Sequence, residues 1–337
     1  MIPDSTLDRR SLLRGVWMAA AMSFTPWSRA SLFWHEPEPV ANPLSAHLPP
    51  QSRINAAVDV YAATAMGLSQ LAAMTTRCEL DVAYGDDAQQ KLDIYLPRAK
   101  LTDLPVFLNI HGGGWTHGYK EWMGLNAPAI VEFPAVYISV GYRLAPAYRH
   151  PAQLEDCFSA LAWVHRNIGR YGGSPSRVFI GGHSAGAHLS SLIVLRRDLH
   201  ARFGLPEQPV RACFPYNGIY DLRHVEVYGE REQNNPGRPL ITDPRSAVQA
   251  SPVVFVAGNR TPFFVIWSEN DNLLIKAESS AFVAALREQP GRVEQHMLPR
   301  FDHFWTHIDQ QRAQNPWTRT LRAWMTGDPH TAPVFIS

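Results

Sequence analysis

A serine between glycines, at the junction of a predicted strand and a predicted helix, constrains the fold more than any other stretch. Residues 177–180 are mostly apolar and lead into Gly181-Gly182-His183-Ser184-Ala185-Gly186, after which a small-residue helical pattern begins. In this order of strand, tight turn and helix, a Gly-x-Ser-x-Gly motif holds its serine in a strained backbone conformation. Glycine is expected at 182 and 186 because a side chain there would collide with the adjacent strand or helix. Ser184 is therefore the candidate nucleophile.

Short apolar runs alternate with helical patterns along much of the chain. Strands are predicted at 78–84, 90–96, 106–110, 135–140, 177–182, 211–217, 262–268 and 292–298, and helices at 54–74, 154–168, 185–197, 275–288 and 308–325. Alternation of buried strands with helices predicts an α/β fold, with a mostly parallel eight-stranded sheet covered by helices on both faces. The first two strands, separated by Gly85-Asp86-Asp87, are expected to pair antiparallel.

The segment 223–261 breaks this alternation. It is polar and rich in turn residues, and it lies between two predicted core strands. We expect it to be a lid or wall over the substrate, or else a surface excursion.

Charge and cysteine content exclude several classes of protein. The net charge of +1 gives no electrostatic case for binding nucleic acid, and no basic cluster is interleaved with aromatic residues. Cys78, Cys157 and Cys213 are too few and too scattered for a disulfide framework or a zinc site. Cys157 and Cys213 are expected to be small buried residues.

The first thirty residues are typical of an export signal. Residues 8–14 (Asp-Arg-Arg-Ser-Leu-Leu-Arg) resemble the twin-arginine motif, and an apolar run at 16–24 precedes Ser28-Arg29-Ala30, which suits a signal peptidase. The run is shorter than the roughly 20 residues that span a bilayer. We therefore expect a signal peptide at 1–30, recognised by the twin-arginine export machinery. This predicts a periplasmic or secreted protein without stable membrane association. An amphipathic helix and an uncleaved anchor are the alternatives.

The remaining chain divides into a leader and a catalytic domain. Residues 31–76 are predicted to form a proline-rich leader followed by a helix that either covers part of the active site or caps the sheet edge. Residues 77–327 are predicted to form the catalytic domain.

A catalytic serine needs a base within hydrogen-bond reach and an acid that holds the base. In a hydrolase of this architecture the chain order is serine, acid, histidine. The loop after predicted strand 262–268 carries Asp271, the predicted acid, and Glu269, its rival. Asp221, at the end of the preceding strand, is a lesser rival because it can simply tie down its own loop.

The predicted base is His303, in the loop after the last predicted strand. Of its neighbours, His296 falls inside that strand and His307 is expected to start the final helix. His303 therefore fits the role best.

A glycine run follows the predicted strand 106–110. In His111-Gly112-Gly113-Gly114-Trp115, consecutive glycines let backbone N–H groups face a substrate oxygen. With the N–H of Ala185, they would stabilise the oxyanion of a tetrahedral intermediate. His111 is expected to shape this loop, and His183 and His188 to be supporting residues.

Aromatic residues near these loops are candidates to line the substrate pocket. They are Trp115 and Trp305 above all, together with Tyr119 and Trp122. For any one of them, a place in the core is an equal alternative.

Together these motifs resemble the α/β-hydrolase superfamily, specifically its carboxylesterase branch with a His-Gly-Gly-Gly oxyanion loop. The resemblance runs from about residue 78 to 325 and is densest at 111–115, at Gly141-Tyr-Arg-Leu-Ala-Pro146 and at 182–189. It implies that Gly113, Gly114 and Ala185 are the oxyanion donors. Gly-His-Ser-Ala-Gly is similar to acetylxylan-esterase-like, feruloyl-esterase-like and kynurenine-formamidase-like members. Two departures are Ala147-Tyr148-Arg149-His150 after Leu-Ala-Pro, and the lack of a glycine before His303.

The resemblance implies two-step hydrolysis of a small to medium ester through an acyl-enzyme, with no metal or organic cofactor. An arylformamidase or amidase using the same triad is the alternative, and a catalytically silent binding module is a second. Fold and triad do not name the substrate.

Overall fold

The computed structural model describes residues 51–224, 240–241 and 243–335. The predicted signal peptide at 1–30, the leader up to residue 50 and residues 225–239 and 242 of the predicted insertion lie outside these residues. Within them, no helix combines the length and apolar character needed to cross a membrane.

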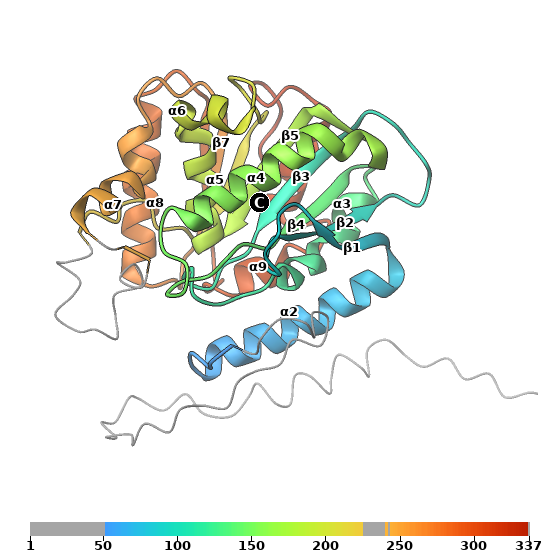
Figure 1. Ribbon diagram of the computed structural model, residues 1–337, viewed down its shortest axis with the longest axis horizontal. Helices are drawn as coiled ribbons and strands as arrows, with labels where there is room; N and C mark the ends of the chain where they lie inside the picture. Colours follow the sequence, from blue (N-terminus) through green and yellow to red (C-terminus); the bar gives the residue numbers. More distant parts are fainter. Residues whose placement is uncertain (1–50, 225–239, 242, 336–337) are drawn as a thin grey trace, which may run out of the picture. The chain divides into compact units, whose positions relative to one another are not determined.

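Eight strands of the described chain form one sheet, in the order β1-β2-β4-β3-β5-β6-β7-β8 (Figure 1). They are β1 (Arg77–Ala83), β2 (Lys91–Leu96), β3 (Leu104–Ile110), β4 (Val136–Val140), β5 (Gly173–His183), β6 (Cys213–Tyr216), β7 (Phe263–Ser268) and β8 (Val293–Leu298). β1 pairs with β2, and β2 with β4, antiparallel, and the other neighbours pair parallel. The predicted mostly parallel sheet and its antiparallel start are confirmed.

Helices cover both faces of the sheet. The longer ones are α2 (Ala56–Thr75), α4 (Ala152–Asn167), α5 (Ala185–Leu195), α8 (Leu273–Arg287) and α10 (Pro316–Thr326). Shorter α-helices are α3 (Ala127–Val131), α6 (Arg197–His200), α7 (Pro244–Gln249) and α9 (Trp305–Asp309). The 3₁₀ turns are η1 (Lys120–Asn126), η2 (Ile168–Tyr171), η3 (Ala201–Phe203) and η5 (Pro252–Phe255).

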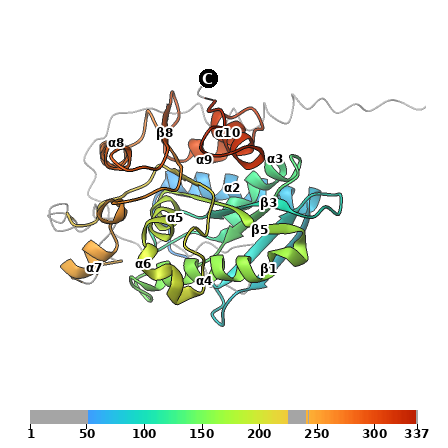
Figure 2. The same ribbon diagram turned by 90° about the horizontal axis from the view of Figure 1, so that it is seen from above.

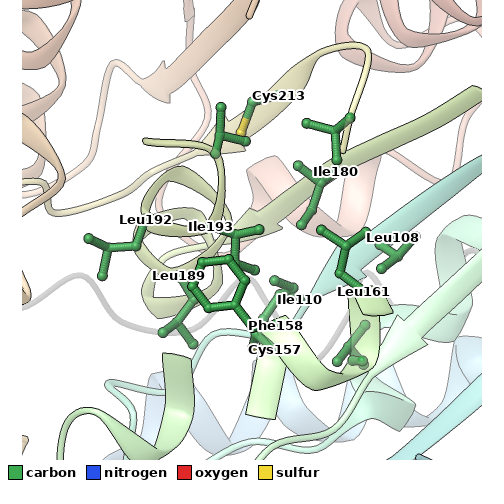
Figure 3. Packing of buried hydrophobic residues seen from close by; sticks show 14 of the residues in the cluster. Leu108, Ile110, Cys157, Phe158, Leu161, Ile180, Leu189, Leu192, Ile193 and Cys213 are labelled. Atoms are coloured by element: carbon green, nitrogen blue, oxygen red, sulfur yellow. The ribbon is translucent and has the colours of Figure 1, made fainter. Parts of the chain in front are cut away.

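Side chains that alternate along the strands build a separate core on each face. On one face, Leu108, Ile110 and Ile180 pack against α4 and α5, with Phe158 and Leu189 among the contacts (Figure 3). On the other face, aromatic side chains of the same strands pack against α2, α3 and α10, which lie together on that side in Figure 2. This second core contains Phe107, Tyr137, Phe214, Trp317 and Trp324.

Two helices expected to be continuous are each divided. The predicted helix 185–197 breaks at Arg196, whose ψ of 59° is outside the helical range, so α6 begins as a separate turn. The predicted helix 308–325 is replaced by α9 and α10. Asn315 caps α10 by accepting from the N–H of Trp317. Pro316 takes the first helical position, where a backbone N–H would have no acceptor within the helix, so the N–H that proline lacks is not missed. The turns η1 and α3, between β3 and β4, were not anticipated.

Candidate active site

The turn between β5 and α5 holds Ser184 in a strained conformation. Its φ is 54° and its ψ is −113°, a region that non-glycine residues rarely occupy. A Cβ on Gly182 would lie 2.5 Å from the backbone of Gly186, and a Cβ on Gly186 would overlap the carbonyl oxygen of Ile110. The expected need for glycine at both positions is confirmed, and Ser184 is presented at the carboxyl end of the sheet.

Asp271 and His303 are brought together by the loops after β7 and β8. His303 Nδ1–H donates to Asp271 Oδ2 at 2.8 Å, so in the neutral ring Nε2 keeps its lone pair. The Asp271 carboxylate is 1% exposed and also accepts from Asn217 Nδ2 and from the backbone N–H of Asn272. Three donors therefore fix this carboxylate, and through it the plane of the imidazole.

His183 ties the serine turn to the loop that carries His303. Its Nε2–H donates to the carbonyl oxygen of His303 at 2.8 Å, and the two ring centroids are 4.7 Å apart. Since His183 immediately precedes Ser184, the serine and the imidazole share one edge of the sheet. Among the described residues, no hydrogen bond joins Ser184 Oγ to the His303 ring. Such bonds commonly tighten only when substrate binds.

The two rival carboxylates are engaged elsewhere. Glu269 is exposed, and its Oε2 accepts from the backbone N–H of Arg300 at 2.8 Å. Asp221 pairs with the Arg223 guanidinium and accepts from Ser251. Asp221 thus secures its own loop.

The glycine run after β3 forms a turn against Ser184; residues 112–117 are called the oxyanion turn below, after their predicted role. Gly113 has a φ of 115° and Gly114 a φ of 61°, values that glycine adopts without strain. The carbonyl oxygen of Gly113 accepts from the N–H groups of Thr116 and His117, which closes the turn. A Cβ on Gly112 would lie 3.1 Å from the Ser184 Cβ, so the turn and the serine are in contact.

His111 shapes this turn, as expected from the sequence. Its ring stacks on Tyr142 with centroids 4.1 Å apart, and the Tyr142 hydroxyl donates to the His111 carbonyl oxygen at 3.0 Å. Burial lowers the pKa of His111 to about 4, which leaves the ring neutral at pH 7.

Trp115 differs from its predicted role in lining a substrate pocket. Its side chain is 1% exposed and packs in the core, where Nε1 donates to His188 Nδ1 at 3.1 Å. His188 Nε2–H in turn donates to the carbonyl oxygen of Ala250, inside the predicted 223–261 insertion, and burial lowers the pKa of His188 to about 3. The φ of 61° at Trp115 turns the side chain inward, so it anchors the oxyanion turn.

The other aromatic candidates have different environments. Trp305 is 53% exposed, two residues after His303, and is accessible to a substrate. Tyr119 and Trp122 are buried but line a cavity of about 340 Å³ between α2 and residues 117–122. The walls contributed by α2 include Val58, Ala62 and Met66.

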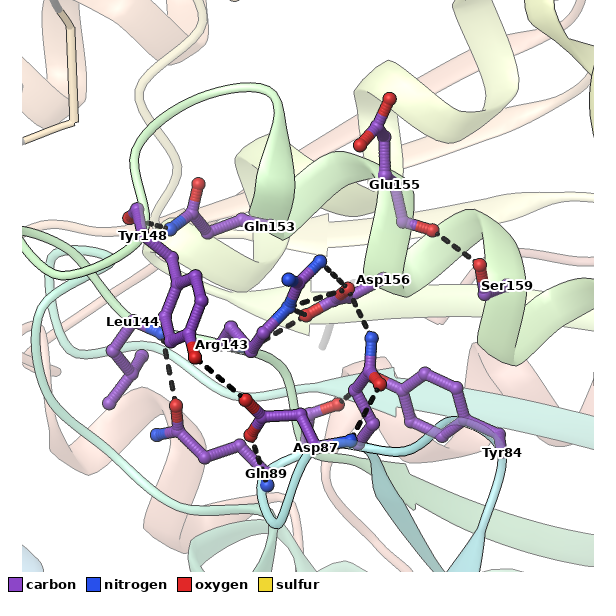
Figure 4. A network of polar contacts seen from close by, with 12 residues as sticks. Tyr84, Asp87, Gln89, Arg143, Leu144, Tyr148, Gln153, Glu155, Asp156 and Ser159 are labelled. Atoms are coloured by element: carbon purple, nitrogen blue, oxygen red, sulfur yellow. Dashed lines mark hydrogen bonds and ion pairs between the residues drawn. The ribbon is translucent and has the colours of Figure 1, made fainter.

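The Gly141–Pro146 stretch contacts the oxyanion turn and supports it. The Arg143 guanidinium and backbone N–H bind the buried carboxylate of Asp156, which also accepts from Gln90 (Figure 4). In the same loop, Ala145 N–H donates to the carbonyl oxygen of Trp115 at 2.9 Å. An ion pair between the partly exposed Arg143 and the buried Asp156 therefore fixes the loop on which the oxyanion turn rests.

Sequence reasoning missed two supporting residues. Asn217 has a φ of 53°, which asparagine tolerates better than most residues, and its amide reaches both Asp271 and Ser268. Tyr61, on α2, packs against the segment that carries His303, which shows that α2 reaches the site. Asparagine at the end of a strand was the available signal for Asn217, whereas no pattern in the sequence pointed to Tyr61. In the described residues, no cluster of three or more His, Cys, Asp or Glu side chains is arranged to hold a metal ion.

Comparison with known proteins gives a consistent family. A model of the BD-FAE family matches residues 92–286. The chain is 33% identical over 220 residues to "Esterase LipQ" of Mycobacterium tuberculosis, covering 62% of this chain and 52% of that protein. It is 28% identical over 241 residues to a kynurenine formamidase of Danio rerio, covering 70% of this chain and 78% of that protein. The chain spans between half and two thirds of the length of the first curated relatives that it matches.

Solved structures support the fold. A hyperthermophilic esterase from Pyrobaculum calidifontis superposes with a TM-score of 0.66 at 20% identity, covering 83% of this chain and 95% of that one. A truncated carbohydrate esterase from gut microbiota superposes with a TM-score of 0.64 at 20% identity, covering 76% of this chain and 97% of that one. With the sheet order, these likenesses establish the α/β-hydrolase fold. The chain belongs to the BD-FAE family of α/β-hydrolases.

Proposed function

We propose that this protein is a serine carboxylic-ester hydrolase that works through Ser184, His303 and Asp271. The observation that carries the proposal is the convergence of four connections, those after β3, β5, β7 and β8, at the carboxyl edge of the sheet. They bring the strained Ser184 to the oxyanion turn and, through His183, to the His303–Asp271 pair. Relatives named as esterases support the reaction class.

The proposed mechanism has two steps. His303 Nε2 takes the proton of Ser184 as Oγ attacks the acyl carbonyl, and the N–H groups of Gly113, Gly114 and Ala185 bind the oxyanion. Ala185 is the first residue of α5, so the positive end of the helix dipole also faces this oxygen. His303 then protonates the leaving alcohol, and a water activated by the same imidazole releases the acid. Asp271 keeps the proton on Nδ1 and stabilises the imidazolium.

The proposed substrate is a small to medium ester. The exposed Trp305 and the apolar cavity beside Tyr119 and Trp122 are the surfaces available for its apolar parts. The test is a panel of p-nitrophenyl acetate through decanoate, measured for the wild type and for Ser184→Ala. A fluorophosphonate probe should label the wild type and not the variant. Absence of both hydrolysis and labelling in the wild type would favour the silent binding module.

An arylformamidase activity is the second candidate. It is favoured by the match to kynurenine formamidase, which covers a larger share of that protein than the esterase match covers of LipQ. A formamide needs only a very small acyl pocket. N-formylkynurenine should therefore be assayed beside the ester panel, and a higher kcat/KM for the formamide would replace the ester proposal.

We also propose that the protein is exported through the twin-arginine machinery. The support is the arginine pair Arg9-Arg10, the short apolar run after it and the small residues at 28 and 30. Fractionation of a bacterial host should find the wild type in the periplasm or medium and Arg9→Lys/Arg10→Lys in the cytoplasm. Equal distribution of the two would contradict export by this route.

A further inference from the structure

We propose that Tyr61 is a positioning residue for the catalytic base, so that α2 is a working part of the active site. This inference rests on the proposed function, because it assigns Tyr61 a role in holding His303. The relevant structure is the base turn, residues 302–307, which begins shortly after β8 and includes the start of α9.

The sheet holds the base turn from one side. The Ser268 hydroxyl, at the end of β7, donates to the carbonyl oxygen of Asp302 at 2.7 Å. The Asp302 carboxylate accepts from the N–H groups of Phe304 and Trp305, which closes the turn on itself. These contacts, together with a hydrogen bond between the Ser268 and Thr306 hydroxyls, hold the turn on the sheet side. Phe304 and His307 have a further anchor outside the sheet.

Tyr61 supplies that anchor from α2. Its ring stacks on Phe304, with centroids 4.9 Å apart and planes 26° from parallel. Its hydroxyl hydrogen-bonds His307 Nδ1 at 2.9 Å, and the other nitrogen of that ring bonds Asn126 Oδ1 at 2.8 Å. Tyr61 thus contacts one residue directly after His303 and another four positions after it.

The protonation states agree with this arrangement. His307 is fully buried, and burial lowers its pKa to about 3, so the ring is neutral at pH 7. A neutral imidazole has one donor and one acceptor nitrogen. With Nε2–H donated to Asn126 Oδ1, Nδ1 accepts the hydroxyl proton of Tyr61. Burial raises the pKa of Tyr61, which keeps that proton in place.

A second buried hydroxyl of α2 binds outside the base turn and provides a matched control. The Ser69 hydroxyl, two turns along the same helix, accepts from the backbone N–H of Leu125 at 2.8 Å. Like the Tyr61 hydroxyl, it is a buried anchor of α2. Its loss should loosen the docking of the helix and leave the position of His303 unchanged.

The experiment compares Tyr61→Phe, Tyr61→Ala and Ser69→Ala in the full chain. Thermal unfolding establishes that each is folded, and p-nitrophenyl acetate gives kcat and KM. Misplacing a reacting group by about 1 Å can cost about 100-fold in rate. We expect Tyr61→Ala to lower kcat by up to about that factor, with KM within about twofold. Tyr61→Phe keeps the stacking on Phe304, so its kcat should lie between those of Tyr61→Ala and the wild type. The kcat of Ser69→Ala should match that of the wild type.

A second readout does not depend on hydrolysis. The Nδ1 proton shared by His303 and Asp271 should give a downfield proton NMR signal in the wild type and Ser69→Ala. We expect it to broaden or vanish in Tyr61→Ala. Wild-type kcat and an unchanged signal in folded Tyr61→Ala would overturn the inference, as would an equal loss of kcat in Ser69→Ala. If Tyr61→Ala does not fold, the same criteria apply to Tyr61→Phe. Failure of the ester proposal would appear differently, as a wild type that neither hydrolyses esters nor is labelled.

Discussion

Replacing Asp271 with asparagine separates the charge of this carboxylate from its hydrogen bonds. Oδ2 accepts from His303 and from Asn217, and Oδ1 accepts from the N–H of Asn272. An asparagine has only one oxygen, which we expect to face His303 and Asn217, because the reverse orientation opposes two donors instead of one. The amide NH₂ then faces the N–H of Asn272. Losing that part-buried hydrogen bond costs about 0.5–1.5 kcal/mol of folding stability.

The expected loss of activity is larger than the loss of stability. A carboxylate in contact with an imidazolium stabilises it by about 1.4–4 kcal/mol. Removing that stabilisation lowers kcat about 10- to 1,000-fold, at 1.36 kcal/mol for each factor of ten. If the amide adopts the reverse orientation, it also imposes the wrong imidazole tautomer, and the loss extends to about 10⁴-fold. Asp271→Asn should therefore be folded and strongly impaired.

Glu269→Gln provides the matched control, because it removes a carboxylate charge two residues away. Its oxygen accepts only the backbone N–H of Arg300 among the described hydrogen bonds, and an amide oxygen preserves that contact. The assay is steady-state hydrolysis of p-nitrophenyl acetate beside thermal unfolding. A kcat for Asp271→Asn within twofold of the wild type would refute its role as the triad acid. A greater loss in Glu269→Gln would transfer that role to Glu269.

Other substitutions and conditions test the surrounding structure. Gly186→Ala should abolish activity and soluble folding, because its Cβ would overlap the Ile110 carbonyl oxygen. Gly67→Ala has open space around it and should stabilise α2 by about 0.5–1 kcal/mol, measured by urea unfolding. Trp305→Ala should raise KM for aryl esters and leave thermal stability within about 0.5 kcal/mol, because its side chain is 53% exposed. An unchanged KM in Trp305→Ala would contradict a contact between Trp305 and the substrate. Stability should fall as the pH drops below about 6.5, because histidines with lowered native pKa bind their protons only in the unfolded chain. The fully buried histidines concerned are His111, His188 and His307. At pH 5 each should lower the free energy of unfolding by about 2 kcal/mol, measured by urea unfolding. A free energy of unfolding that does not change with pH would contradict neutral burial of these rings.

The parts of the site that sequence reasoning could predict are local in the chain. The strand, glycines and helix around Ser184 form one contiguous motif, and both the strained φ of Ser184 and the close approach of Gly182 to Gly186 arise within it. Asp271 and His303 could be predicted from their positions at the ends of strands. Each follows a parallel strand, and the carboxyl ends of parallel strands meet at one edge of the sheet. Chain order and strand ends therefore predicted which carboxylate would lie against which imidazole.

The parts that could not be predicted depend on contacts between distant segments. Trp115 stands beside the oxyanion glycines in the sequence, yet its positive φ turns the ring into the core toward His188. The sequence pattern does not encode that backbone conformation. Tyr61 is 246 positions from its partner His307, and the helical pattern of α2 was equally compatible with covering the site or capping the sheet edge. Tertiary packing decided between these alternatives.

The histidines around the site show how packing assigns different roles to one residue type. Burial lowers the pKa of His111, His183, His188 and His307, so these rings serve as neutral donors and acceptors. The His303 side chain is 21% exposed and is the one among these five whose ring nitrogen bonds a carboxylate. This contrast matters for the proposed reaction, because a permanent cation nearby would oppose the imidazolium that forms each time the serine loses its proton. Neutral histidines can hold the base turn and the oxyanion turn without that penalty, which lysine or arginine in the same positions would impose.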